Sequence, residues 1–340
     1  MTRQTISLLL LAATMAILLL LVPDVLLIVF AGILLAVFLQ GGGHWIASKL
    51  GLADGWGIGV FLLGIVAALV IFGLAVAPAI GAQVDELTRR VPEAFETFRQ
   101  RLAEYSWGSA LLDRLTPETL ASTESRSAAM TAVSSTFGAL GNFVIILFIG
   151  LYGALDPKVY RKGLTLLLAP SIRRRGDEIL RATAATLRNW LSAQLMAMTV
   201  VGVLTALGLW FAGVPLAFAL GLLAGLLAFI PNIGPVLAIA PALLLAFPDG
   251  RSMVLIVLAI YLGVQALESY VVTPLIQQEK VSLPPALVIS AQLLFGVLFG
   301  ILGLALATPI AAALMTVIGL AYVEDYLGRE KPAGIEGGRR

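Results

Sequence analysis

No cysteine occurs in the 340-residue sequence, and the only histidine is His44. A chain without cysteine forms no disulfide, no thiolate nucleophile and no cysteine-type metal site. One histidine cannot build a zinc cluster or a proton relay by itself, and we interpret His44 as a loop residue after a hydrophobic span. The sequence also lacks the phosphate-binding motif G-x-x-x-x-G-K-[ST]. We therefore expect no enzymatic activity, no metal and no cofactor.

Charged residues are scarce too. They make up 12% of the chain against 59% hydrophobic residues, and the mean hydropathy is +0.99, whereas soluble domains contain about 25% charged residues. The net charge is only +2, and no basic stripe suggests a nucleic-acid partner. This composition predicts an all-α polytopic protein embedded in membrane lipid, with roughly six to eight transmembrane helices of about 20 residues each.

Three apolar runs predict three transmembrane helices in residues 1–80. They span 6–22, 25–39 and 56–79, and Pro23-Asp24 separates the first two. A cleaved signal peptide is the alternative for the first run, but no convincing small-residue cleavage site follows it. Gln40 precedes three glycines, so we expect a loop from there to about Gly55.

Residues 81–134 differ sharply in composition from their surroundings. The stretch from Gly81 to Met130 holds eight acidic residues and six arginines. Apolar residues recur every three or four positions from Val84 to Tyr105, which is the period of an amphipathic helix. We expect a small helical extramembrane domain, either a solvated scaffold or a docking surface for a partner.

Residues 135–155 predict a fourth transmembrane helix, followed by a basic segment at 156–191. Eight basic and three acidic residues occupy that segment. A basic amphipathic helix of this kind is typical of the surface of an anionic leaflet, and its charge places it in the cytoplasm. Counting spans from there puts both termini, including the 324–340 tail, in the cytoplasm.

The region 192–323 predicts a transport core. After a span at 192–211, the apolar run Val214–Phe247 would make roughly 50 Å of helix, too long for one crossing of a ~30 Å hydrocarbon core. Pro231 must break it, and the freed backbone groups must be buried in protein or hydrated. We therefore expect a re-entrant hairpin whose tip contains Asn232, Gly234 and Pro235.

A second overlong run, 285–322, contains glycines and a Thr308-Pro309 pair. Each run follows a plain span, so residues 192–247 and 253–322 resemble two copies of one pattern. If both runs are re-entrant, the copies are inverted, as in transporters that bind solute between broken helices. The alternative is two kinked helices that cross the membrane.

Glu268 is the only acidic residue inside a predicted span, with Gln265 and Thr273 nearby. An intramembrane carboxylate marks a functional site by default, and Glu268 could bind a proton or a cation. Alternatively, it reaches water from the end of its span. Asn232 either contacts solute or satisfies freed backbone groups.

Four motifs occur in order: Phe229-Ile-Pro-Asn-Ile-Gly-Pro235, Glu268 with Thr273-Pro-Leu-Ile276, Lys280-Val-Ser-Leu-Pro-Pro285, and Phe299-Gly-Ile-Leu-Gly303 through Pro309. With them the sequence resembles the autoinducer-2 exporter family of bacterial inner-membrane proteins. The resemblance implies export of autoinducer-2 or sodium/proton antiport, and assembly into homo-oligomers. The residues that carry it are Pro231, Gly234, Pro235, Glu268, Pro274, Pro285, Gly300, Gly303 and Pro309.

Three functional hypotheses follow. The first is an inner-membrane secondary transporter or facilitator that exports a small solute, with the two broken helices as its gate. Glu268, Asn232, Gln265 and Thr273 would line the path, and the prolines and glycines named above would allow bending. The second is a sodium (cation)/proton antiporter with Glu268 as its ion site. The third is a non-transporting membrane scaffold that docks partners through residues 81–134.

Overall fold

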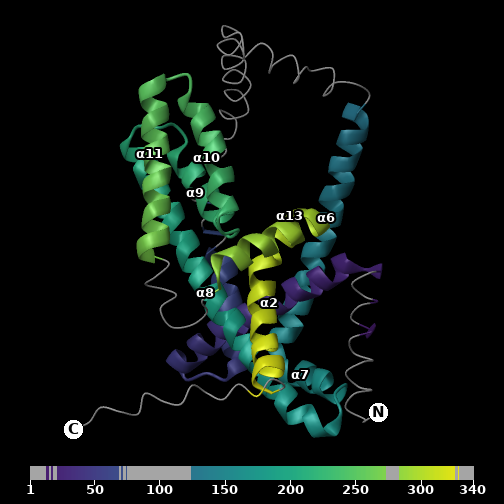
Figure 1. Ribbon diagram of the computed structural model, residues 1–340. Coiled ribbons are helices and arrows are strands. Elements are labelled where there is room, and N and C mark those ends of the chain that lie inside the picture. The colour runs from purple at the N-terminus through teal and green to yellow at the C-terminus, as the bar shows by residue number, and fades with distance from the viewer. Residues whose placement is uncertain are drawn as a thin grey trace, which may run out of the picture. The chain divides into compact units, whose positions relative to one another are not determined.

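The computed structural model describes residues 21–68, 124–272 and 283–325, together with positions 13, 14, 17, 70, 71, 74 and 328. All regular elements within these residues are helical (Figure 1), which confirms the all-α class. They are α2 (Pro23–Leu50), a helix at Asp54–Ala68, α6 (Glu124–Leu155), α7 (Pro157–Leu166), the 3₁₀ helix η2 (Pro170–Ile172), α8 (Arg173–Phe211), α9 (Ala217–Leu227), α10 (Ile233–Ala246), α11 (Arg251–Leu267), the π-helix η3 (Glu268–Val272), α13 (Pro285–Ile318) and the π-helix η4 (Gly319–Glu324).

Four of the described helices are long and apolar enough to cross a membrane, or five if the bent pair of α6 and α7 forms one span. Three shorter apolar helices accompany them: Asp54–Ala68, α9 and α10. The chain is therefore a polytopic membrane protein. It divides into two compact units, Met1–Gly59 with Ile146–Ser192 and Glu279–Arg340 as unit 1, and Val60–Ile145 with Ala193–Gln278 as unit 2.

In unit 1 the glycines that follow Gln40 belong to α2, so the predicted loop from 40 to 55 is wrong. A Cβ added at Gly43 would lie 2.7 Å from Ile58 Cα, which shows that glycine here admits the next helix rather than a turn. The helix ends at Gly51, with φ of 67°. His44 is accordingly helical, and its Nδ1 lies 3.1 Å from Asp54 Oδ1.

The basic segment also differs from the prediction. α8 runs without interruption from Arg173 to Phe211, so the second half of the basic segment and the span at 192–211 are one helix. Leu187, Trp190 and Leu191 are buried in it, because they pack against protein rather than lipid headgroups. The amphipathic helix of this segment is instead α7, whose N-cap Asp156 accepts a hydrogen bond from Val159 N–H.

An ionic cluster joins the start of α8 to the end of η4. Arg175 at the start of α8 donates to Asp325 (2.8 Å), Glu324 (3.2 Å) and the Leu320 carbonyl (3.3 Å). These three residues lie in or next to η4, so Arg175 ties the last described turn of the chain to α8.

α13 breaks once, at Gly300, whose φ of 62° and ψ of −146° lie outside the helical region. The fold at this point is sharp, since a Cβ at Gly303 would lie 2.6 Å from Phe299 Cβ. The predicted break at Pro309 is wrong: the helix continues through this buried residue. A proline removes one backbone donor, and in α13 that loss does not interrupt the helix.

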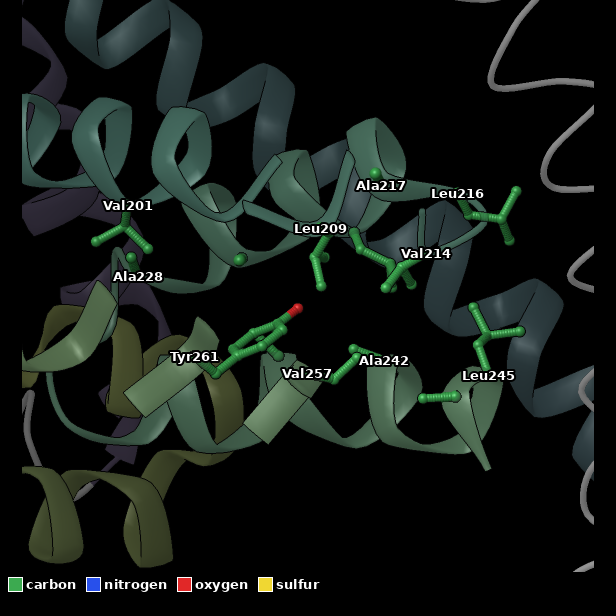
Figure 2. Packing of buried hydrophobic residues seen from close by; sticks show 14 residues of the cluster. Val201, Leu209, Val214, Leu216, Ala217, Ala228, Ala242, Leu245, Val257 and Tyr261 are labelled. Atoms are coloured by element: carbon green, nitrogen blue, oxygen red, sulfur yellow. The ribbon is translucent and has the colours of Figure 1, made fainter. Parts of the chain in front are cut away.

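Within unit 2, the second half of α8 packs with α9, α10 and α11. Their small and branched side chains form one hydrophobic cluster, of which Figure 2 labels Leu209, Val257 and Tyr261 among others. The cluster holds a helical hairpin, α9 and α10, against two longer helices. The predicted break in the run 214–247 is thereby confirmed: α9 ends at Leu227 and α10 begins at Ile233.

Candidate functional site

The tip of the α9–α10 hairpin is a tight turn around Asn232. The Ile233 N–H donates to the Pro231 carbonyl at 2.8 Å, and Asn232 between them has φ of 66° and ψ of −44°. This is a γ-turn with positive φ at its centre, a rare and strained conformation. The Gly234 N–H donates to the Ile230 carbonyl at 2.9 Å and so closes the tip into α10.

The residues predicted to break the hairpin have different parts in it. Pro231 lies in the tip itself, while Pro235 is in the first turn of α10, where a missing N–H costs no helical hydrogen bond. Gly234 is buried, and a Cβ there would clash with the Leu227 carbonyl. Glycine therefore allows α10 to start directly against the end of α9.

A side chain of α8 satisfies a backbone group of the tip. The Gln194 amide donates a 2.6 Å hydrogen bond to the carbonyl of Ala228, the residue that follows α9. Gln194 is partly buried, and its bond gives a carbonyl at the helix break a protein partner. Our sequence reasoning missed Gln194, although a glutamine inside a predicted span was the signal that could have found it.

Asn232 combines strain with exposure. It is an exposed residue, and its side chain makes no capping hydrogen bond to α10. A non-glycine residue at positive φ costs on the order of 1–3 kcal/mol, and such residues concentrate at binding sites and switches. The turn therefore projects an amide from the hairpin tip instead of using it to cap the helix.

Glu268 lies at the point where α11 changes to the π-helix η3. The Gln265 amide donates to Glu268 Oε2 at 2.7 Å and to Ser269 Oγ at 3.2 Å, and the Ser269 hydroxyl is 3.5 Å from Glu268 Oε2. Single π-turns inside α-helices are frequent at functional sites. The carboxylate is partly buried and held by side chains of its own helix, an arrangement that suits a cation or proton site.

The hairpin tip and the Glu268 cluster lie at the same end of unit 2. α10 and α11 are adjacent, are of similar length at 14 and 17 residues, and join through a short turn at Phe247–Gly250. They run antiparallel (Figure 1), so the start of α10 and the end of α11 are neighbours. The structure thus brings Asn232, Gln265 and Glu268 to one end, as the path hypothesis requires.

Other predicted site residues lie elsewhere. Thr273 and Pro274 fall outside the described residues, as does the 81–123 part of the expected extramembrane domain. Pro285 is the first residue of α13, a favoured position for proline. Gly300 and Gly303 form the bend of α13 in unit 1, and among the described residues no group of three or more His, Cys, Asp or Glu residues could hold a metal.

The model of the AI-2E family transporter matches residues 7–322. The chain belongs to the AI-2E transporter family. It is 28% identical over 251 residues, 71% of each chain, to YrrI of Bacillus subtilis (strain 168), by name a candidate transport protein.

Two further relatives are also named as transport proteins. MT0215 of Mycobacterium tuberculosis (strain CDC 1551 / Oshkosh), also named as a candidate transport protein, is 29% identical over 277 residues, which are 80% of this chain and 74% of MT0215. The AI-2 transport protein TqsA of Escherichia coli (strain K12) is 27% identical over 291 residues, 81% of this chain and 80% of TqsA. The AI-2E transporter described here is therefore a membrane transporter by family.

Proposed function

We propose that this AI-2E transporter is a secondary transporter or facilitator that exports a small solute through the bacterial inner membrane, with the α9–α10 hairpin as its gate. The observation that carries the proposal is the hairpin tip: Gln194 supports its backbone, and Asn232 projects from it under strain. A helix break supported in this way at membrane depth suits a solute path better than a static span.

Autoinducer-2 is the first solute to test, because the sequence resembles its exporters and TqsA is named for its transport. The transporter, reconstituted in proteoliposomes, would be given autoinducer-2 and a panel of small polar solutes under imposed proton or sodium gradients. We expect efflux of at least one neutral polar solute. An Asn232→Gly transporter, which keeps the turn but lacks the amide, should show a raised KM; wild-type vesicles no leakier than empty ones would exclude the proposal.

Cation/proton antiport is the second candidate, and the partly buried Glu268 carboxylate favours it. One variant, Glu268→Gln, distinguishes antiport from solute export. Glu268→Gln should abolish pH-dependent sodium flux if Glu268 is the ion site, whereas an exporter coupled to no cation should keep its solute efflux. Unaltered cation flux in this variant would remove the antiport role.

We also propose that the transporter is a homo-oligomer with both termini in the cytoplasm. Many large apolar side chains of the described helices are exposed, among them Val297 at 85% and Ile301 at 81%, and lipid or another subunit must cover them. Native mass spectrometry from detergent would give the subunit number. Accessibility of single cysteines introduced into this cysteine-free chain would give the sidedness, and termini labelled from outside would contradict it.

A further inference from the structure

Two hydroxyl groups are buried in unit 2 without partners. Thr205 on α8 is 1% exposed and Tyr261 on α11 is 7% exposed. Among the residues that the structure describes, neither Thr205 Oγ1 nor Tyr261 Oη has a hydrogen-bond partner. Buried polar groups in folded proteins are nearly always paired, so each exception requires an explanation.

Thr205 lies on the face of α8 that contributes to the hydrophobic cluster, and Tyr261 belongs to that cluster. Val201, Thr205 and Leu209 are spaced by four residues and so share one face of α8, and Val201 and Leu209 belong to the cluster with Tyr261. Figure 2 shows the Tyr261 hydroxyl pointing away from α11 toward Leu209.

The contact between α8 and α11 shows that Thr205 and Tyr261 lie at similar positions along the two helices. A Cβ at Gly208 would lie 2.8 Å from Ile260 Cγ2, so the helices touch where Gly208 meets Ile260. Thr205 is three residues from Gly208 and Tyr261 is next to Ile260. At about 1.5 Å per residue, both Cα positions are within roughly 5 Å of that contact along the helices.

Tyr261 also continues the polar residues of the candidate site. Tyr261, Gln265 and Glu268 are spaced by four and three residues, which places them on one face of α11. Gln265 already bonds to Glu268. The result is a polar stripe that runs from the Glu268 end of unit 2 to the buried hydroxyl of Tyr261.

We propose that Thr205 and Tyr261 form an internal binding site for a small, uncharged, hydroxylated solute on its way through unit 2; this inference rests on the proposed export function. A hydroxyl both donates and accepts a hydrogen bond, so two of them suit a polyol or a hydroxyketone. The surrounding cluster is aliphatic, with Val201, Leu209 and Val257 among its members. Such surroundings offer an ion no counter-charge, which makes a charged occupant unfavourable.

The packing of α9 on α8 determines what must move for a solute to reach this site. α9 meets α8 through small residues on both sides of Thr205: a Cβ at Gly202 would lie 3.3 Å from Gly225 Cα, and one at Gly221 would lie 2.6 Å from Ala206 N. Small residues let the two backbones approach closely at these points. Entry of a solute requires the hairpin to shift on α8 and the larger side chains of the cluster, such as Leu209 and Leu220, to repack.

The test uses substitutions that remove only the hydroxyls. Thr205→Val and Tyr261→Phe would be made in the full-length transporter, reconstituted and measured for efflux of glycerol and autoinducer-2, with rubidium as a cation probe. We expect each variant to raise KM for the hydroxylated solutes at least fivefold and to leave rubidium flux unchanged. Each should also raise the thermal unfolding midpoint in detergent, because an unpaired buried hydroxyl is lost.

Matched controls separate this role from a general loss of hydroxyls. Thr199→Val on α8 and Tyr152→Phe on α6 alter exposed residues and should change neither KM nor the midpoint. If Thr205→Val fails to fold, Thr205→Ser, which keeps the hydroxyl, should show the wild-type KM, while Thr205→Ala should show a raised KM.

The outcomes distinguish the two proposals. Wild-type efflux with unchanged KM in Thr205→Val and Tyr261→Phe would overturn this site, and the hydroxyls would then bind water only, while export would stand. Wild-type vesicles that move none of the hydroxylated probes would overturn both proposals.

Discussion

The Gln194 side-chain amide on α8 and the Ala228 main-chain carbonyl at the hairpin tip form a 2.6 Å hydrogen bond. This contact joins the transmembrane helix that the hairpin packs on to the backbone that the helix break leaves open. This hydrogen bond satisfies a carbonyl at the helix break, which explains how a break inside a hydrophobic run is tolerated.

Gln194→Leu should destabilise the transporter, because the Ala228 carbonyl would stay buried without its donor. An unsatisfied buried group of this kind costs about 1–3 kcal/mol, which differential scanning fluorimetry of the full chain in detergent would detect as a lower midpoint. Met196→Leu on the same helix changes an exposed side chain (56%) and serves as the control. Equal midpoints for Gln194→Leu and wild type would show that the tip has another source of support.

Asn232 allows backbone strain to be separated from side-chain chemistry. Asn232→Gly should keep or raise stability, because glycine adopts positive φ without steric cost. Asn232→Val should lower stability by about 1–2 kcal/mol, since a left-handed conformation penalises residues with a Cβ. The measurement is chemical or thermal unfolding of both variants. Equal stability of the Gly and Val variants would contradict the positive φ at this turn.

Gly300 should resist replacement because of its backbone conformation. Its φ of 62° and ψ of −146° suit glycine alone, so Gly300→Ala should destabilise or straighten the helix at a cost of about 1–3 kcal/mol. Gly263→Ala in α11 is the matched control, because a Cβ there meets nothing within 4 Å. It should be neutral or stabilising by up to about 1 kcal/mol. A greater loss of unfolding free energy in Gly263→Ala than in Gly300→Ala would contradict the bend of α13 at Gly300.

α7 should lie in the membrane interface, with its apolar face in the lipid. It turns 93° from the apolar helix Leu140–Leu155. Arg161 ties it to α8 through a 2.6 Å ion pair with Asp177. The exposed Lys158 and Lys162 lie together at one edge of an arc of exposed apolar side chains. The arc consists of Val159 (60% exposed), Tyr160 (52%), Leu164 (50%) and Leu166 (53%).

A pair of single-cysteine variants tests this placement on the cysteine-free chain. A fluorophore at Val159→Cys should be quenched by brominated lipid at least twofold more strongly than one at Lys158→Cys, in vesicles of phosphatidylcholine and phosphatidylglycerol. The double substitution Lys158→Gln with Lys162→Gln should weaken the quenching at position 159, because exposed lysines bind an anionic surface electrostatically. Added salt should weaken the quenching for the same reason. Equal quenching at both positions would place α7 in water or against another subunit.

Local chemistry made some features of this transporter readable from its sequence. The run 214–247 is too long for one crossing and carries Pro231, Gly234 and Pro235 close together, so its break was readable from the sequence, whereas Pro309 by itself does not interrupt α13. Glu268 stands out in the sequence because a carboxylate in an apolar run is rare, and its role as a site residue remains a prediction. The apolar composition likewise fixes the class of protein, since so few charged residues cannot cover a soluble fold.

Tertiary packing decided the features for which the sequence-based predictions were wrong. Gly43 and its neighbours read as a loop, yet they lie in α2 and admit Ile58, because glycine serves turns and close helix contacts equally. Of the residues expected to break the second run, Gly300 has non-helical dihedral angles, while α13 continues through Pro309. Only the fold pairs Gln194 with Ala228, because such a bond depends on which helix passes the tip, and no local residue preference encodes that.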